Sequence, residues 1–272
     1  MTYILGIDAA WTAHNPSGVC LLHHRPHQPP QVVKLARSYY EFLERDTPDW
    51  TAKPRPSPPL LTELIRHCQD RNYEVRVAAL DIPLGPQPVR SYREADRALT
   101  RAYSSRGAPV HSPTPERPGI ISDTIYRQLT HAGFRWAGTQ KILDQPSFIE
   151  VYPHAAIIEL FGYAYRLPYK VQKRGQYWRD DSSAVRYRKS IDKLLELKQR
   201  IEGSITFAPH VSLPALDATQ HYTLSFLKGY EDTLDSLISA LSGYAYWQGR
   251  ATAYGNEYGA IWVPDAYKLT VG

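Results

Sequence analysis

Apolar residues along the chain alternate between short runs of strand length and stretches with helical spacing. Residues 2–8 (TYILGID) form an apolar run, a turn rich in Asn, Pro and Gly follows at 15–18, and a second apolar run covers Val19 to Leu22. A third strand is expected near Val32 to Tyr39. Short apolar runs separated by turn residues predict an antiparallel meander at the N-terminus.

The middle of the chain predicts a central strand followed by an insertion. Residues 60–68 place apolar side chains at helical spacing, and residues 75–85 (VRVAALDIPLG) are almost continuously apolar. A strand that is apolar on both faces is typical of a central position beside a parallel neighbour. We expect residues of about 86–147 to form an insertion, with helices at about 91–103 and 120–132 on either side of a Gly- and Pro-rich loop.

The C-terminal half predicts two more strands and the longest helix. A strand is expected at 147–153 and the last one at 259–264, with a helix of about 231–247 between them. A basic and aromatic segment at about 166–200 contains an amphipathic helix, at 184–200. Three antiparallel strands followed by further β and α units predict a mixed sheet with helices on its faces.

Composition narrows the class of protein. The chain has 272 residues, of which 43% are apolar and 22% charged, so it is expected to form one globular α/β domain over 1–272 and not a coiled coil or a disordered chain. No apolar run approaches the ~20 residues of a membrane span, and the N-terminus lacks the basic region of a signal peptide. Cys20 and Cys68 stand in apolar settings without zinc spacing, which favours a reducing, cytoplasmic compartment. The net charge of +5 permits a polyanionic partner.

Two aspartates interrupt apolar strands at their ends. Asp8 ends the first strand and Asp81 ends the central one, where an unpaired charge is expensive to bury. If these strands are neighbours, both carboxylates lie at one edge of the sheet. Two unit charges about 4 Å apart repel by ~4 kcal/mol at an effective dielectric constant of 20, and a divalent cation would relieve that repulsion. Carboxylate oxygens favour Mg²⁺ or Mn²⁺ over zinc. Taken singly, each aspartate is equally compatible with a local turn.

A second acidic pair lies on the long helix. Asp232 and Asp235 are spaced i, i+3 and therefore leave one helix face. Ser239 and Ser242 continue that stripe with small side chains, which would let it approach the sheet closely. Asp232 alone could instead be an N-cap, because acidic residues are favoured in a first turn.

Glu150 is a further candidate, within the strand FIEVYP. Alternation places it on the face opposite Ile149 and Val151. A metal ligand, a residue that orients a ligand, and a half-exposed strand residue are all compatible with this position.

Several of these motifs, taken in order, resemble a known superfamily. GIDAA, ALDIPLG and D-x-x-D-S-L-I-S-A together resemble the RNase H-like superfamily, and the last is similar to the helix of Holliday-junction resolvases of the RuvC type. More narrowly, the chain resembles a domain-of-unknown-function family of predicted nucleases. The segments of that family have counterparts here in Arg93 with Asp96, in Glu150 to Pro153, and in Glu257 to Ile261.

The resemblance implies both a fold and a chemistry. The implied fold is an RNase H-like mixed five-stranded sheet with flanking helices and a helical and loop insertion. The implied activity is that of a metal-dependent nuclease, in which Asp8, Asp81, Asp232 and Asp235 bind Mg²⁺ or Mn²⁺, with Glu150 as a further catalytic candidate. Two such ions about 3.5–4 Å apart would flank the scissile phosphate.

The basic and aromatic segment is the candidate nucleic-acid surface. Its cations could neutralise phosphates and its rings could stack on bases, although a basic stretch is equally compatible with a merely solvated face. These residues are Lys170, Lys173, Arg174, Tyr177, Trp178, Arg179 and Arg186. A second set is a candidate lid over the metals or support for their ligands: Arg93, Asp96, Arg106, His154 and Glu257. His154 and His111 could assist the reaction, although a solvated histidine is the simpler interpretation of each.

Three other functions stay open at the level of sequence. A protein could keep the fold and bind nucleic acid without catalysis. An actin-like ATP-dependent phosphotransferase also opens with a strand, Gly-x-Asp and a hairpin, but its second phosphate-binding hairpin is missing here. A phosphatase with a carboxylate nucleophile would need a D-x-D motif that the first strand lacks. The apolar, Tyr-rich C-terminal helix is also a candidate homodimer surface.

Overall fold

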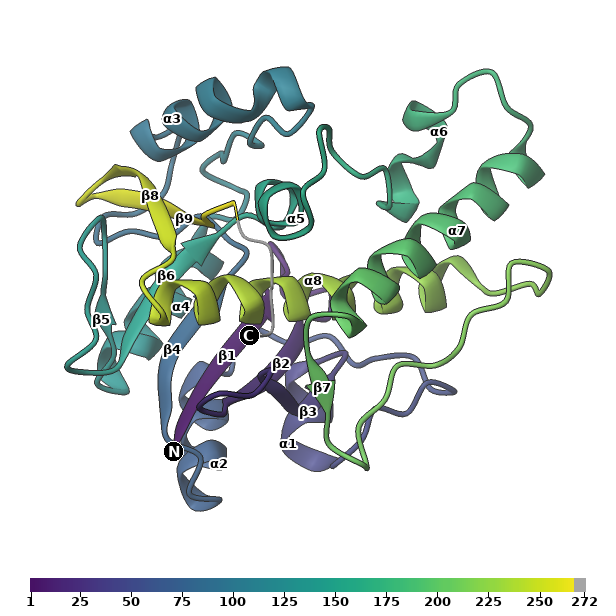
Figure 1. Cartoon of the computed structure of the whole chain (residues 1–272). Coiled ribbons are helices and arrows are strands. Elements are labelled where there is room, and N and C mark those ends of the chain that lie inside the picture. The colour runs from purple at the N-terminus through teal and green to yellow at the C-terminus, as the bar shows by residue number, and fades with distance from the viewer. Residues whose placement is uncertain (267–272) are drawn as a thin grey trace.

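A nine-stranded mixed sheet forms the centre of the protein and helices cover both of its faces (Figure 1). The structure is a computed structural model and describes residues 1–266. The strands are β1 Thr2–Asp8, β2 Gly18–His24, β3 Gln31–Ala36, β4 Val75–Leu80, β5 Arg135–Trp136, β6 Ser147–Val151, β7 Thr206–Phe207, β8 Ala251–Asn256 and β9 Gly259–Pro264. The α-helices are α1 Tyr39–Glu44, α2 Leu61–Asp70, α3 Glu94–Tyr103, α4 Ile120–His131, α5 Pro153–Phe161, α6 Arg174–Tyr177, α7 Ser183–Glu202 and α8 Leu224–Trp247. Short 3₁₀ turns lie at Ser104–Arg106 (η1) and Val171–Lys173 (η2).

The sheet has the order β7-β3-β2-β1-β4-β6-β9-β8, and β5 also pairs with β6. The predicted N-terminal meander is confirmed, because β1, β2 and β3 pair antiparallel. The predicted central strand is confirmed as well, since β4 lies between β1 and β6 and is parallel to both. The third strand ends at Ala36 and not near Tyr39, because Ser38 caps the short helix α1 that follows.

The predicted five-stranded sheet is wrong in its strand count: the sheet has nine strands, six of which match runs identified in the sequence, and three strands have no counterpart there. Two of the additional strands, β5 and β7, are only two residues long, and such pairs leave no periodic pattern in a sequence. The third, β8, is a partly exposed edge strand of mixed polarity that pairs with β9. One side of β6 is shared, with β5 beside its first residues and β9 beside its last.

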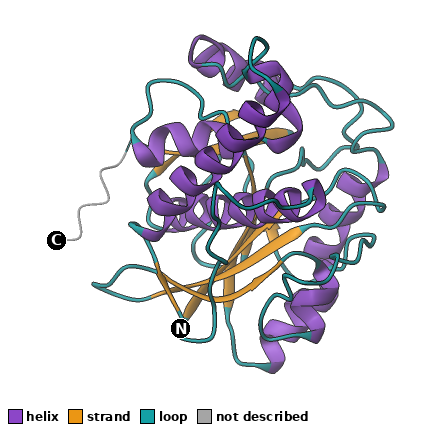
Figure 2. Ribbon diagram, turned by 90° about the vertical axis from the view of Figure 1, so that its right-hand side faces the viewer, coloured by secondary structure: helices purple, strands orange, loops and turns teal. Residues whose placement is uncertain are grey.

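Side-chain alternation divides the core into two layers around the sheet. Ile4, Val77 and Ala79 face α8 together with side chains of α5 and α7. Leu5 and Leu80 face the opposite way, toward α1, α2 and α4. Figure 2 shows helices on both sides of the strands, with the long α8 lying against them.

The long helix starts earlier than the sequence predicts. It begins at Leu224, not near Glu231, because the Thr223 side chain accepts a hydrogen bond from the Phe226 N–H and caps it there. Asp232 is therefore two turns inside the helix and is not its N-cap. None of the helices within residues 1–266 is both long enough and apolar enough to cross a bilayer.

The segment predicted as an insertion, at about 86–147, is built into the layers of the fold. It contains α3, α4 and β5. Helix α3 packs against β8 and β9, α4 packs beside α2, and β5 extends the sheet.

Candidate metal centre

Strand register places the first two aspartates side by side. In the parallel pair of β1 and β4, Ile7 is opposite Leu80, and the Asp81 N–H donates to the Ile7 carbonyl at 2.9 Å. Asp8 follows Ile7 as Asp81 follows Leu80, so the two residues continue the same register. Partners in a parallel ladder point to the same face, and both lie in phase with the residues that face α8. Both side chains are only partly buried.

The second pair reaches this edge because α8 lies unusually close to the sheet. A Cβ atom added at Gly6 would stand 2.3 Å from the Ala240 backbone nitrogen and 2.4 Å from the Ser236 carbonyl oxygen. One added at Gly18 would stand 2.3 Å from the Asp232 carbonyl oxygen. At Gly6 and Gly18 the close approach is made by the α8 backbone at Asp232, Ser236 and Ala240, while the predicted Ser239 and Ser242 are buried further along the same helix.

Carboxylates distant in sequence converge as a result. Asp8, Asp232 and Asp235 each offer a carboxylate oxygen, and these three atoms lie within 4.8 Å of one another. Asp81 adjoins Asp8 through the strand register, and the charge on Asp235 raises its pKa. The sequence prediction that these four residues lie together is consistent with this geometry.

Two lysines and a fifth carboxylate complete the cluster. The Lys170 ammonium group donates to Asp235 and lies 3.4 Å from Glu231. The Lys228 ammonium group donates to Asp232 and, at 2.9 Å, to Glu231. Glu231 also accepts from the Val171 N–H at 2.6 Å, which fixes the chain carrying Lys170 to α8. The Tyr169 hydroxyl donates to Asp235 at 2.5 Å.

The electrostatics of the cluster divide the carboxylates into two groups. Burial, together with the charges of Asp232 and Asp235, raises the pKa of Asp8 well above its ordinary value. Burial likewise raises the pKa of Asp81 to about 7. For Glu231, burial is outweighed by the ammonium groups of Lys170 and Lys228, and its pKa is lowered. At Asp8 and Asp81, burial outweighs the same two ammonium groups, which form their hydrogen bonds with Asp235, Asp232 and Glu231 instead.

The donor set fits a divalent cation bound through oxygen. Five carboxyl groups face two ammonium groups here, so the acidic groups outnumber the cations that could neutralise them. Among the hydrogen bonds of residues 1–266, none reaches the side chain of Asp8 or Asp81, whereas Asp232 and Asp235 have partners. A set of carboxylate oxygens with no histidine nitrogen or cysteine sulfur among the candidate ligands is the type that Mg²⁺ and Mn²⁺ prefer.

Glu150 is not part of this edge. It faces away from Ile149 and Val151, as alternation predicts, and therefore points to the other side of the sheet from Asp81. There its carboxylate accepts from the Arg93 guanidinium at 2.6 and 2.7 Å and from the Leu84 N–H at 2.8 Å. Glu150 is thus a buried partner of Arg93 and not a half-exposed strand residue, while its charge raises the pKa of Asp81; its catalytic role stays a prediction.

The remaining residues of the predicted lid or support are dispersed. Arg93 and Asp96 form the capping box at the start of α3 and pair at 2.7 Å. Arg106 pairs with Glu159 of α5. Glu257 is exposed in the turn between β8 and β9. His154 packs its ring 5.5 Å from that of Tyr169, whose hydroxyl donates to Asp235.

The predicted nucleic-acid surface is divided by the fold. Lys170 belongs to the carboxylate cluster and is not on an exposed basic surface. The guanidinium groups of Arg174 and Arg186 donate to main-chain carbonyls, of Val171 and of Trp178 respectively, each at 2.8 Å. The others keep more open positions: Lys173 and Tyr177 are partly buried, Trp178 is edge-on to Tyr177, and Arg179 is exposed.

A comparison with protein families gives one match. The family model described as "Protein of unknown function (DUF429)" matches residues 6–258, nearly the whole chain. The chain belongs to this family. No curated protein and no solved structure shows detectable similarity to it. The matched range contains all five carboxylates of the cluster, and the predicted membership of a domain-of-unknown-function family is confirmed.

Sequence reasoning missed two residues of this DUF429 site, Glu231 and Lys228. Placing the start of the helix near Glu231 left Lys228 outside it and left Glu231 as an unremarkable first-turn acid. A signal was present: Thr223 precedes an apolar spacing of Leu224, Leu227 and Tyr230 that extends the helix upstream. With that extension, Lys228 stands i, i+4 from Asp232.

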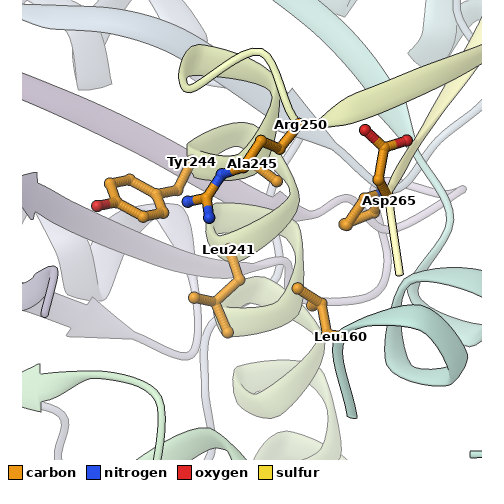
Figure 3. Close-up of a pocket in the computed structure, with 7 residues that line it drawn as sticks. Leu160, Leu241, Tyr244, Ala245, Arg250 and Asp265 are labelled. Carbon is orange, nitrogen blue, oxygen red and sulfur yellow. The ribbon is translucent and has the colours of Figure 1, made fainter. Parts of the chain in front are cut away.

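A small pocket of the DUF429 chain lies at the other end of α8 (Figure 3). Leu160 of α5 lines it together with Leu241 and Ala245 of α8, and Asp265 closes one side. Leu241 is already six residues beyond Asp235, so the pocket is separate from the carboxylate cluster.

Proposed function

We propose that this protein is a metal-dependent nuclease with an RNase H-like core, which hydrolyses phosphodiester bonds at the carboxylate cluster. One observation carries the proposal: carboxyl groups from β1, β4 and α8, remote in sequence, meet at one edge of the sheet and outnumber the ammonium groups beside them, so that ionising Asp8 and Asp81 is costly. Mutual repulsion of this kind is destabilising unless a cation relieves it.

The topology supports the RNase H-like part of the proposal. Strands β1 to β3 form an antiparallel meander, and β4 and β6 continue the sheet on the other side of β1 in parallel. Asp8 and Asp81 lie at the carboxyl ends of the two adjoining strands, and α8 crosses that edge. This is the arrangement that the resemblance in the sequence led us to expect.

In the proposed site, Asp8 and Asp81 hold the metal from the sheet, while Asp232 and Asp235 hold it from the helix. A bound divalent cation would supply an activated water and stabilise the charge that develops on the phosphate. The chain positions these ligands through the close packing of α8, and Glu231 retains Lys170 and Lys228 beside them. Those ammonium groups are placed to meet phosphate oxygens once the metal competes for their carboxylates.

The open part of the basic segment would hold the nucleic acid. Lys173 and Arg179 are available to neutralise phosphates, and Trp178 offers a partly exposed ring for stacking. The proposal includes both DNA and RNA.

A second candidate is a nucleic-acid-binding protein without catalysis. One observation favours it: Lys170 and Lys228 already form ion pairs with Asp235, Asp232 and Glu231. If these pairs persist in solution, they replace the metal as the source of positive charge. The two functions differ in metal affinity, which is directly measurable.

The deciding experiment is Mn²⁺ calorimetry with a cleavage assay on the same samples. Wild-type protein, Asp8→Asn and the exposed control Asp192→Asn are titrated with Mn²⁺ and then incubated with single-stranded, duplex and junction DNA and RNA. The nuclease proposal expects binding and cleavage by wild type and the control, and loss of both in Asp8→Asn. Absence of Mn²⁺ binding by wild type, or cleavage that survives Asp8→Asn, refutes the proposal.

A further inference from the structure

Four side chains that carry nitrogen atoms lie close together on the side of the carboxylate cluster where Tyr169 lies. His154 is in the first turn of α5, Arg166 follows that helix, and Lys173 ends the 3₁₀ turn η2. His111 comes from the Pro-rich loop after η1, and its Nε2 atom lies 2.6 Å from the Lys173 Nζ atom. Three separate segments therefore bring these side chains together.

This group has little negative charge of its own. Burial, together with the charges of Arg166 and Lys170, lowers the pKa of Lys173 to about 8. Burial and the same cations also lower the pKa of His154 and of His111. The one carboxylate that acts on Lys173 in the opposite sense is Glu231, which is already bonded to Val171 and Lys228. In this group the cationic side chains therefore outnumber the carboxylates, whereas in the aspartate cluster the carboxyl groups outnumber the cations.

Two buried nitrogen atoms in the group have no hydrogen-bond partner among residues 1–266. They are Nδ1 of His154, a residue only 5% exposed, and Nε of Arg166. Burying a polar group without a partner is costly. Arg166 donates through its other nitrogens, to the Tyr177 hydroxyl and to the Gly107 carbonyl at 3.4 Å, so its guanidinium is held in place.

The group adjoins the candidate metal centre and also reaches solvent. Tyr169 contacts the His154 ring with its own ring and Asp235 with its hydroxyl, so one side chain separates the two sites. The charges of both Arg166 and Asp81 act on the pKa of Tyr152, so this side chain lies within range of both. At the outer end, His111 reaches the surface while its ring lies against Lys173, which shields part of it from water. A strand lying over the carboxylates would therefore carry a neighbouring phosphate toward these side chains.

We propose that His111, His154, Arg166 and Lys173 form a subsite for a phosphodiester group of the substrate strand, next to the one that is cleaved. This inference rests on the proposed nuclease function, because it assumes that the strand reaches the carboxylates. Lys173 and Arg166 supply the charge, and the histidines supply directional hydrogen bonds. Arg166, which composition and spacing did not single out, becomes a residue that positions the substrate.

The test uses a ligand with a single phosphodiester, a thymidine dinucleotide, followed by ³¹P NMR in EDTA so that metal plays no part. Wild type, Lys173→Met and Arg166→Met are compared with Lys53→Met and Arg188→Met, which remove the same charges from exposed positions outside the group. We expect wild type and both controls to bind alike. Each subsite variant should bind about tenfold more weakly, the loss of one charge-assisted contact. Far-ultraviolet circular dichroism of every variant confirms that it is folded, and Lys173→Met is the decisive variant because its side chain is only partly buried.

The outcomes separate the subsite from the nuclease proposal. No binding by wild type, equal binding by Lys173→Met, or an equal loss in the two controls overturns the subsite. Binding of thymidine monophosphate but not of the dinucleotide overturns it too, because the group would then recognise a terminal phosphate. Mn²⁺ calorimetry on the same wild-type sample reports on the carboxylates alone, so a missing metal response with Lys173-dependent dinucleotide binding rejects the nuclease and retains the phosphate site.

Discussion

Replacing Asp81 with asparagine should stabilise the metal-free protein, although the residue lies in the proposed active site. Burial raises the pKa of this carboxyl to about 7, from the 3.8 of an unperturbed aspartate. The folded state therefore holds a proton more tightly than the unfolded state does. The asparagine side chain keeps the size of the group and removes its charge.

The magnitude and the pH dependence follow from linkage. A shift of about 3 pKa units corresponds to about 4 kcal/mol, at 1.36 kcal/mol per unit, as an upper value for the cost of ionising Asp81 in the fold. Below pH 3.8 the carboxyl is protonated in both states, and the cost is absent. Between pH 3.8 and about 7 only the unfolded state loses its proton, so the stability of wild type falls as the pH rises. Asp81→Asn should therefore exceed wild type by up to about 4 kcal/mol at pH 8 and by less than half of that at pH 5.

The assay is urea unfolding at pH 5 and pH 8, in EDTA and in Mn²⁺. At a Mn²⁺ concentration 100 times its dissociation constant, wild type should gain about 2.7 kcal/mol, and Asp81→Asn should gain far less. Asp192→Asn, an exposed residue of α7, controls for the general change in charge. If Asp81→Asn is less stable than wild type at pH 8 in EDTA, or if Mn²⁺ stabilises the two equally, the electrostatic reasoning fails.

Three further substitutions probe the packing and the ion pairs. Gly6→Ala should displace α8, because the new Cβ would meet the Ala240 backbone at 2.6 Å or less. We expect the free energy of unfolding to fall by about 1–3 kcal/mol or more, and Mn²⁺ binding to be lost. Lys228→Met should destabilise the protein in EDTA, because it leaves acidic partners uncompensated, and Mn²⁺ should restore part of that loss in a thermal melt. Arg93→Met should cost about 3–5 kcal/mol in urea unfolding by leaving Glu150 buried without its cation, with no recovery in Mn²⁺.

Each of these substitutions has a matched control on the surface of the same chain. Gly203→Ala adds a Cβ at ordinary contact distances of 3.5 Å or more and should change stability by less than about 1 kcal/mol. Lys193→Met and Arg97→Met remove partners of exposed ion pairs, each worth ~1 kcal/mol or less. A Gly6→Ala protein that matches Gly203→Ala, or an Arg93→Met protein that matches Arg97→Met, would contradict the packing described here.

The sequence was informative where a single local pattern determined the structure. The run VRVAALDIPLG predicted a buried central strand that ends before Pro83, and β4 has that place. The strand is apolar on both faces because a central strand is covered by helices on either side of the sheet. The short strands β5 and β7 lacked such a pattern, because two residues cannot show a period.

The candidate site was predictable in part for the same reason. Asp8 and Asp81 stood out because a carboxylate at the end of an apolar strand needs compensation. Glu231 and Lys228 did not stand out, because a charged residue near a helix start is ordinary by sequence alone. Only packing shows that Glu231 is 2% exposed and holds the N–H of Val171.

The sequence by itself therefore determined which strands are buried, which carboxylates interrupt them, and on which face Glu150 stands. The tertiary structure alone decided which charges meet. Folding pairs Lys170 with Asp235 and Glu150 with Arg93. It also brings Arg166 close enough to His154 for its charge to act on the histidine. The physical reason is the distance along the chain over which each effect acts. Hydrophobic alternation is fixed by the near neighbours of a residue in the sequence. The environment of a buried charge depends on segments that are distant in sequence and are brought to it only by folding.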